Sequence, residues 1–139
     1  MDLDTALRYA RATNRSVLTT LRGNGLPQLS NVLHAVGDDG LIRISTTADR
    51  AKYTNLRRWP WAAVKIDGES FWSYAVLEGD VELSAVAADP DDEATDELVE
   101  LYRRLSGEHP DWEDYRRSTV ADRRVVVRIR PNRAYGLAG

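Results

Sequence analysis

The chain has 139 residues, of which 42% are hydrophobic and 29% charged, and its formal net charge is -3. These values are typical of one globular domain, residues 1–139, that buries most of its apolar surface. The acidic balance argues against a nucleic-acid partner, and the absence of cysteine excludes disulfides and thiolate chemistry. With no long apolar run and no signal-peptide pattern at the N-terminus, we expect a cytoplasmic protein without a membrane partner.

The first half of the chain alternates between strand signals and turn signals. A helix capped by Asp2 or Asp4 is expected to run to about Asn14. A second, short helix is expected to begin after Asp49 as its N-cap and to end before Pro60. Strands are predicted at residues 16–22, 28–36, 41–47 and 61–67 because these segments are rich in apolar and β-branched residues between glycine turns.

The second half begins with a long strand-like segment, residues 71–86, in which Gly79 is expected to mark a bend or bulge. An acid-rich loop and helix follow, ending at Gly107, and then a helix at residues 111–121 and a strand at 124–130. Strands joined mostly by hairpins, with few helical crossovers, predict an antiparallel sheet or barrel with appended helices. This is an α+β fold.

Several kinds of catalytic machinery are missing from the sequence. There is no phosphate-binding GxxxxGK[ST] loop, no GxSxG and no HExxH, and the GNGLPQ stretch leads into a strand rather than a helix. The two histidines, His34 and His109, lie at unrelated places, so we predict no metal site. We interpret His34 as a structural or surface residue, with a role in lining a pocket as the alternative. If the protein is an enzyme, a cofactor carries the reaction.

The segment RAKYTNLRR, residues 50–58, concentrates four basic side chains in an acidic protein. Arg57 and Arg58 fall in the last turn of the short helix, where positive charge complements the helix dipole. Arg50 and Lys52 fall in the first turn, where a cation opposes the dipole. They are either solvated charges or part of an anion site formed with the free backbone N–H groups.

Three other segments carry groups that suit a planar ring. Hydroxyl and amide side chains stand at the start of the second strand and at the end of the third. Trp72 and Tyr74, two residues apart in a predicted strand, are expected to share one face. Together with an anion clamp, these groups would suit a ligand with a planar ring and a phosphate. The alternative for the two aromatic residues is packing in the core or at a subunit interface.

The order of these segments resembles the split β-barrel flavin and deazaflavin oxidoreductases related to pyridoxamine 5′-phosphate oxidase. The motifs G-x-PQLSNV, S-x-x-x-x-RAKxxNLRR, WSYAVxEG and LYRxxxGEHxDWxDYR resemble actinobacterial members that use the deazaflavin coenzyme F420. The similarity extends from about Asn14 to Leu137 and includes a later DRRV.

The resemblance implies an antiparallel split β-barrel that forms a homodimer, with two cofactor sites at the subunit interface. Arg50 and Lys52 would bind the cofactor phosphate, amide and hydroxyl groups would border the ring, and Trp72 would approach from the partner subunit. The cofactor-binding residues that it implies are Gln28, Ser30, Asn31, Ser45, Thr46, Arg50, Lys52 and Trp72.

The chain departs from the FMN oxidases of this family at two places. Those enzymes usually carry an arginine on the second strand and an Arg-Gln pair on a later strand. This chain has Ser30-Asn31 and Ser73-Tyr74 there. The resemblance therefore favours F420 over FMN and argues against oxidation of pyridoxamine phosphate.

The leading hypothesis is a reductase that transfers a hydride between F420 and an unsaturated or conjugated small molecule. The protein would supply orientation and a water-poor site. No residue is a convincing proton donor, Tyr74 and His34 being weak candidates, and the catalytic residues stay unassigned. One alternative is a binding module that carries F420 or FMN, or sequesters a ligand, without turnover. Another is an FMN-dependent flavoprotein.

Overall fold

A computed structural model describes residues 1–138. Its helices are α1 (Leu3–Ala12), α2 (Ala51–Arg58), α3 (Glu93–Ser106) and α4 (Trp112–Ala121). Its strands are β1 (Arg15–Leu21), β2 (Pro27–Leu33), β3 (Ala35–Val36), β4 (Ile42–Thr47), β5 (Trp61–Asp67), β6 (Tyr74–Leu83) and β7 (Arg124–Leu137). The strands form one antiparallel sheet in the order β2-β1-β5-β6-β7-β4-β3.

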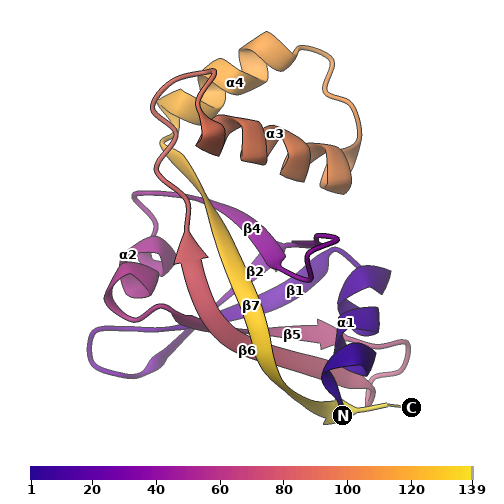
Figure 1. The fold of residues 1–139 in the computed structure, drawn as a ribbon. Coiled ribbons are helices and arrows are strands. Elements are labelled where there is room, and N and C mark those ends of the chain that lie inside the picture. Colours follow the sequence, from indigo (N-terminus) through magenta and orange to yellow (C-terminus); the bar gives the residue numbers. More distant parts are fainter. Residues whose placement is uncertain (139) are drawn as a thin grey trace.

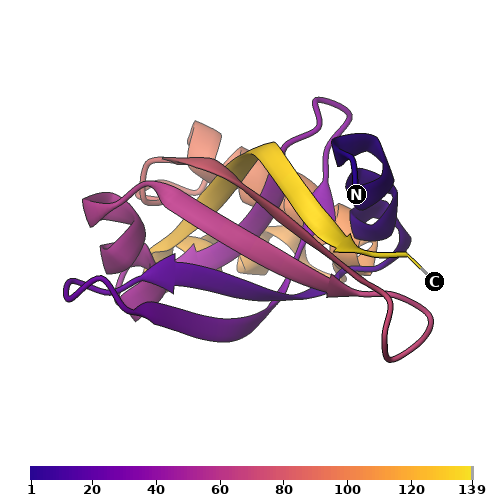
Figure 2. The same ribbon diagram turned by 90° about the horizontal axis from the view of Figure 1, so that it is seen from below.

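The sheet curls around a core, with helices at its ends (Figures 1 and 2). The long strands β6 and β7 run side by side through the molecule, while α3 and α4 pack together at one end of it (Figure 1). The inward face supplies fully buried residues such as Ile44, Val64 and Leu77. Each contributes about 1.5–3 kcal/mol through burial. The predicted α+β split barrel with appended helices is confirmed.

The run of valines in β7 is explained by burial on both faces of that strand. Val127 and Ile129 join the core inside the curled sheet, whereas Val126 packs with Leu98 and Ala94 of α3 on the other side. A strand covered on both faces reads as a continuous apolar run rather than an alternating one. The sheet therefore has a helix-covered part at α3 and an uncovered outer part further along.

Residues 28–36 do not form the single strand that the sequence predicts. The strand is interrupted at His34, whose backbone N–H donates to the carbonyl of Asn14 at 2.8 Å. The imidazole Nε2–H donates to the carbonyl of Ala10 at 2.8 Å, and Nδ1 accepts from the Ser16 hydroxyl at 2.9 Å. His34 is fully buried and both of its ring nitrogens are engaged within the protein, which agrees with its interpretation as a structural residue.

The segment 71–86 is also shorter as a strand than predicted. Ser70 and Ser73 exchange hydrogen bonds in a turn, and β6 begins only at Tyr74. Trp72 therefore lies outside the strand, and the expected shared face with Tyr74 is wrong. The bulge predicted at Gly79 is confirmed: the register shifts there, and a Cβ atom would lie 1.9 Å from the carbonyl oxygen of Arg130.

The final strand is longer than the predicted 124–130, because β7 continues to Leu137 beside β6. Gly107, at φ 80°, ends α3 as predicted. None of the helices within residues 1–138 is long and apolar enough to cross a membrane. Over the same residues, no group of three or more histidine and acidic side chains is placed to hold a metal ion.

Candidate functional site

Two buried side chains, Asn55 and Leu56, hold helix α2 against the inner face of the sheet. Asn55, 5% exposed, donates from Nδ2 to Thr20 Oγ1 at 3.1 Å and to Gln28 Oε1 at 2.8 Å. Leu56 beside it packs in the core. These contacts fix the position of the helix and place Gln28 next to it. Because Oε1 of Gln28 is occupied, its Nε2 amino group is the part available to a ligand.

The N-terminus of α2 has no side-chain cap. The N-cap residue is Arg50 and not Asp49 as predicted, because the Asp49 carboxylate accepts instead from the Thr47 hydroxyl. Arginine has no acceptor atom and cannot satisfy the first N–H groups of a helix. The acidic first turn found in α1, α3 and α4 is missing as well. The start of α2 thus presents N–H donors and positive charge together.

Arg50 and Lys52 stand at this helix start without an acidic partner. No carboxylate of residues 1–138 lies within 4.0 Å of either side-chain cation. Lys52 is half-buried, and burial together with the positive charge of Arg50 lowers the pKa of its ammonium group. Both causes disfavour the charged form, and a bound anion would offset them. The predicted pair therefore lies together, in surroundings that favour an anion.

Thr46 and Ser45 point in opposite directions from β4. Thr46 is buried on the same side as Ile44, facing the inside of the sheet where α2 contacts β4. Ser45 faces outward, and its hydroxyl accepts from Nη1 of Arg124 at 3.2 Å. Thr46 thus shares the α2 side of the strand, whereas Ser45 lies on the side of α3, as Arg43 does.

The three predicted residues of β2 divide in the same way. Gln28 and Ser30 are half-buried on the inner face, opposite Thr20 and Leu18 of β1. Asn31 points to the outer face, where it borders a hollow of about 460 Å³ together with Arg15, Val17, Lys65 and Asp67. One chain therefore brings Gln28, Ser30 and Thr46 to the side of α2, and leaves Asn31 on the opposite surface of the sheet.

Trp72 lies far from the other candidates within one chain. It is 73% exposed and forms an edge-to-face pair with Phe71 at 4.7 Å, in the turn between β5 and β6. Helix α2 precedes the start of β5, and this turn follows its end, so a strand of about 20 Å separates them. Figures 1 and 2 show α2 and the turn at opposite ends of the sheet.

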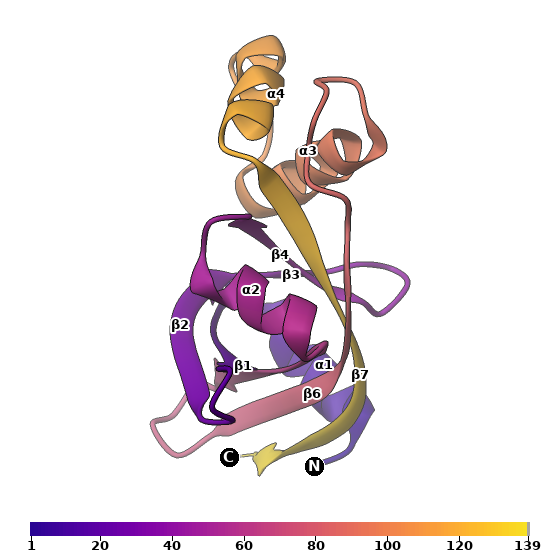
Figure 3. The same cartoon turned by 90° about the vertical axis from the view of Figure 1, so that its left-hand side faces the viewer.

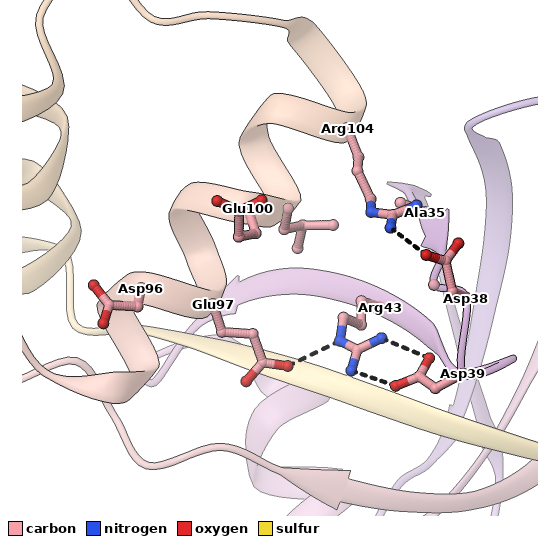
Figure 4. A pocket seen from close by; sticks show the side chains of 10 residues that line it. Ala35, Asp38, Asp39, Arg43, Asp96, Glu97, Glu100 and Arg104 are labelled. Carbon is pink, nitrogen blue, oxygen red and sulfur yellow. Dashed lines mark hydrogen bonds and ion pairs between the residues drawn. The ribbon is translucent and has the colours of Figure 1, made fainter.

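Two hollows of the chain lie away from these residues. One of about 700 Å³ lies between α1, β3 and the end of α3, and includes His34. The other, of about 530 Å³, lies between α3 and the turn from β3 to β4 (Figure 4). In the second, Arg43 donates to Asp39 and to Glu97, at 2.8 and 2.9 Å. Its central charges are already neutralised, so we place the candidate site at α2.

One residue near α2 was missed by the sequence analysis. The Ala48 N–H donates to the carbonyl of Arg123 at 3.0 Å, which joins the end of α4 to the turn before α2. Arg123 has φ 54°, the one positive φ of a non-glycine residue within 1–138. The DRRV motif contained this residue, but nothing in its local pattern connected it to RAKYTNLRR.

Known proteins share this architecture. A profile of the pyridoxamine 5′-phosphate oxidase family matches residues 3–138. A conserved hypothetical protein from Mycobacterium tuberculosis is similar in fold, with 24% identity, a TM-score of 0.73 and coverage of 98% of this chain and 84% of its own. A protein named F420 reductase is 25% identical, with a TM-score of 0.69 and coverage of 92% and 94%. A heme binding protein from Mycobacterium smegmatis has the same fold, with 18% identity, a TM-score of 0.68 and coverage of 96% and 54%.

The family match spans almost the whole chain, and it agrees with the seven-stranded antiparallel sheet and its appended helices. The same fold occurs in proteins named for F420 and for heme, so the fold by itself does not select the ligand. The chain belongs to the pyridoxamine 5′-phosphate oxidase family.

Proposed function

We propose that this protein is an F420-dependent oxidoreductase that reduces an unsaturated or conjugated small molecule. The observation that carries the proposal is the start of α2, where uncapped N–H groups meet two cations that have no carboxylate partner. Such a donor set fits a phosphate group. The likeness to a protein named F420 reductase supports the choice of cofactor. When bound, F420 would supply the hydride chemistry.

The residues of this chain would bind and orient the cofactor. Arg50, Lys52 and the first N–H groups of α2 would hold its phosphate. The Nε2 amino group of Gln28, whose Oε1 is fixed by Asn55, would donate to an acceptor on the ring edge. Ser30 and Thr46 lie on the same inner face and would border the ring. Orientation of this kind is the main contribution that we assign to the protein.

FMN is less suited to this chain, which has Ser30-Asn31 and Ser73-Tyr74 in place of the arginine and the Arg-Gln pair of the FMN oxidases. Ser73 is buried, and its hydroxyl is engaged with Ser70, so it offers nothing to a flavin. A histidine-ligated heme is also disfavoured. Both nitrogens of His34 are used inside the protein, and Nδ1 of His109 accepts from the N–H of Asp111 at 2.9 Å. That bond leaves the proton on Nε2, the atom that would have to bind iron.

We further propose that the protein acts as a homodimer formed by the outer face of the sheet. The register places exposed apolar side chains of two strands on this face: Leu29 and Leu33 of β2, and Tyr135 and Leu137 of β7. Phe71, 87% exposed, and Trp72 lie at one end of β5 near it. Since one chain holds Trp72 and α2 about 20 Å apart, Trp72 of the partner subunit would complete the site and exclude water from the ring.

The principal alternative is a protein that binds F420 without turning over a substrate. No described residue stands at the candidate site as an evident proton donor, so the proton of the product would come from solvent. Screening reduced, cofactor-loaded protein against quinones, enones and tetrapyrroles separates the two. We expect reoxidation of F420 well above the rate without protein for at least one class. Tight binding with background rates throughout would support a carrier instead.

A further inference from the structure

A hollow of about 640 Å³ lies between α1 and the turn from β5 to β6. Its walls include Arg8 and Tyr9 of α1, Arg15 at the start of β1, and Glu69 and Ser73 of the turn. Figure 3 views the molecule with α2 in front and α1 at the far side, and Figure 1 shows the two helices on opposite sides of it. Within one chain the hollow is therefore separate from the candidate phosphate site. Its volume falls in the range of about 300–1,000 Å³ that is typical of small-molecule sites.

Arg15 connects this hollow to the face on which the proposed dimer forms. It lies on the outer face of the sheet with Val17, two residues further along β1, and it also borders the outer hollow that includes Asn31. On its other side is the turn that carries Trp72. Asn31 and Trp72 are both predicted to approach the cofactor ring, and one chain holds both of them away from α2. In the proposed dimer, where Trp72 completes the partner's site, Arg15 and its hollow would lie beside the ring that the partner binds.

The charges around the hollow leave one positive charge unbalanced. No carboxylate of residues 1–138 lies within 4.0 Å of the guanidinium of Arg8 or of Arg15. Asp67 also borders the hollow, but it is paired with Lys65, so Glu69 is the remaining carboxylate among the lining residues. Two arginines that face one free carboxylate are balanced by one further negative charge. A carboxylate carries one charge, whereas a phosphate monoester carries about 1.5 to 2, so a carboxylate is the better match.

We propose that this hollow binds a carboxylate of the substrate, so that the conjugated small molecule is a carboxylic acid. The planar guanidinium groups of Arg8 and Arg15 can hold a carboxylate through parallel hydrogen bonds. The side chains of Tyr9 and Ala12 give the apolar part of the molecule a wall to pack against. This inference rests on the proposed function and its dimer, because the hollow of one subunit would serve the ring bound by the other. It names the substrate class of that site.

The test compares a conjugated acid with its uncharged amide, trans-cinnamate with trans-cinnamamide, by calorimetric titration of the F420-loaded protein. We expect wild-type protein to bind the acid about 10-fold more tightly than the amide. Arg8→Gln and Arg15→Gln should each raise the Kd of the acid about 3- to 10-fold, and leave the Kd of the amide and of F420 unchanged. Arg11→Gln, exposed in the last turn of α1 but outside this hollow, is the matched control and should change none of the three.

Glu69→Gln tests the same charge balance in the opposite direction. The substitution removes the carboxylate that would repel the substrate, so we expect the Kd of trans-cinnamate to fall about 2-fold. A gain of affinity cannot come from a loss of folding, and Glu69 is exposed on the turn. Size-exclusion chromatography shows whether Arg15→Gln keeps the oligomeric state of wild-type protein.

The outcomes separate this inference from the function beneath it. If wild-type protein binds F420 but binds the acid and the amide equally, the hollow does not select a carboxylate. The same conclusion follows if the arginine variants weaken the acid and the amide alike. In both cases this inference is wrong while the proposed function stands. If wild-type protein binds no F420, the proposed function fails, and this inference fails with it.

Discussion

Two regions of the molecule concentrate arginine and lysine, and they use them differently. Between α3 and the sheet, Glu97 accepts from Arg43 at 2.9 Å, and Asp39 binds Arg43 from the other side (Figure 4). Glu97 also accepts from Arg128 at 2.8 Å. Burial would raise the pKa of Glu97, but the hydrogen bonds from the two arginines outweigh it and lower that pKa. At the start of α2, Arg50 and Lys52 have no such partner.

Pairing with carboxylates separates structural charge from functional charge in this fold. Where each cation has a carboxylate, the network fixes α3 to β4 and β7. Removing one partner leaves a half-buried charge without its counter-ion, which lowers the stability of the fold. Where the cations repel each other and oppose the helix dipole, they lower stability in the absence of an anion. The hollow between α3 and the sheet is well formed, but its charges are satisfied. The more open α2 surface is the better candidate.

The largest expected effect is on stability, from Glu97→Ala. The side chain of Glu97 is 19% exposed, and its loss leaves Arg43 and Arg128 without their shared partner. We expect the free energy of unfolding to fall by about 3 kcal/mol in urea titrations, with F420 affinity unchanged. Glu100→Ala, on the same helix but paired only with Arg103, should cost about 0.5 kcal/mol or less. Equal effects of the two substitutions would contradict the structural role of the network.

Lys52→Ala should have the opposite pattern of effects, lowering F420 affinity without lowering stability. We expect F420 affinity to fall by about 1.5–3 kcal/mol, or roughly 10- to 150-fold, because a charged hydrogen bond to the phosphate is lost. Stability without cofactor should be unchanged or higher, since a half-buried charge beside Arg50 is removed. Fluorescence titration and thermal unfolding measure the two effects. Arg57→Ala, in the last turn of α2, is the control, and an equal loss of affinity there would overturn the phosphate assignment.

Asn55→Ala should affect both properties, because this residue ties α2 to the sheet. It removes the bonds to Thr20 and Gln28, and we expect a loss of about 2 kcal/mol in unfolding free energy. Affinity for F420 should fall as well, since the helix start and the Gln28 amide lose their support. Thr54→Ala, exposed on the same helix, should change neither quantity. Full affinity in Asn55→Ala would show that the helix needs no such anchor.

The smallest expected effect is a pH dependence set by His34, which takes part in neither group of charges. Burial lowers the pKa of His34 below its usual value of 6.5. The unfolded chain therefore binds a proton more readily, so stability is fully present above pH 6.5 and declines as the pH falls below it. Urea titrations at pH 7.5 and 5.5 measure the decline. In His34→Gln this part of the pH dependence should disappear, and an unchanged slope would exclude His34 as its source.

Much of the fold could be predicted from local pattern. Residues 61–67 form β5 with the predicted bounds, because Pro60 and Gly68 delimit an apolar run. The bulge at Gly79 and the end of α3 at Gly107 follow from backbone requirements that glycine meets. The break at His34 could not be foreseen, because it depends on the carbonyls of Ala10 and Asn14, which only the folded chain brings there.

The candidate site could be predicted only in part, because some of its residues are brought together by contacts between distant parts of the chain. Arg50 and Lys52 follow from their place in a helix start, and the family resemblance named the others. Alternation along a strand predicts that Ser45 and Thr46 face opposite sides, but it does not tell which of them lies on the α2 side, since that requires knowing which side of β4 is covered. Arg123 was missed because one backbone hydrogen bond, from Ala48, brings it to the site.

The proposed function depends on the unpaired cations of α2, which would hold F420. The most direct measurement is a side-by-side fluorescence titration of the purified protein with F420, FMN and heme, using wild type and Lys52→Ala. We expect tight binding of F420, much weaker binding of FMN and heme, and a loss of F420 affinity in the variant. Tighter binding of FMN or heme would overturn the choice of cofactor, and F420 binding that does not depend on Lys52 would overturn the phosphate site at α2.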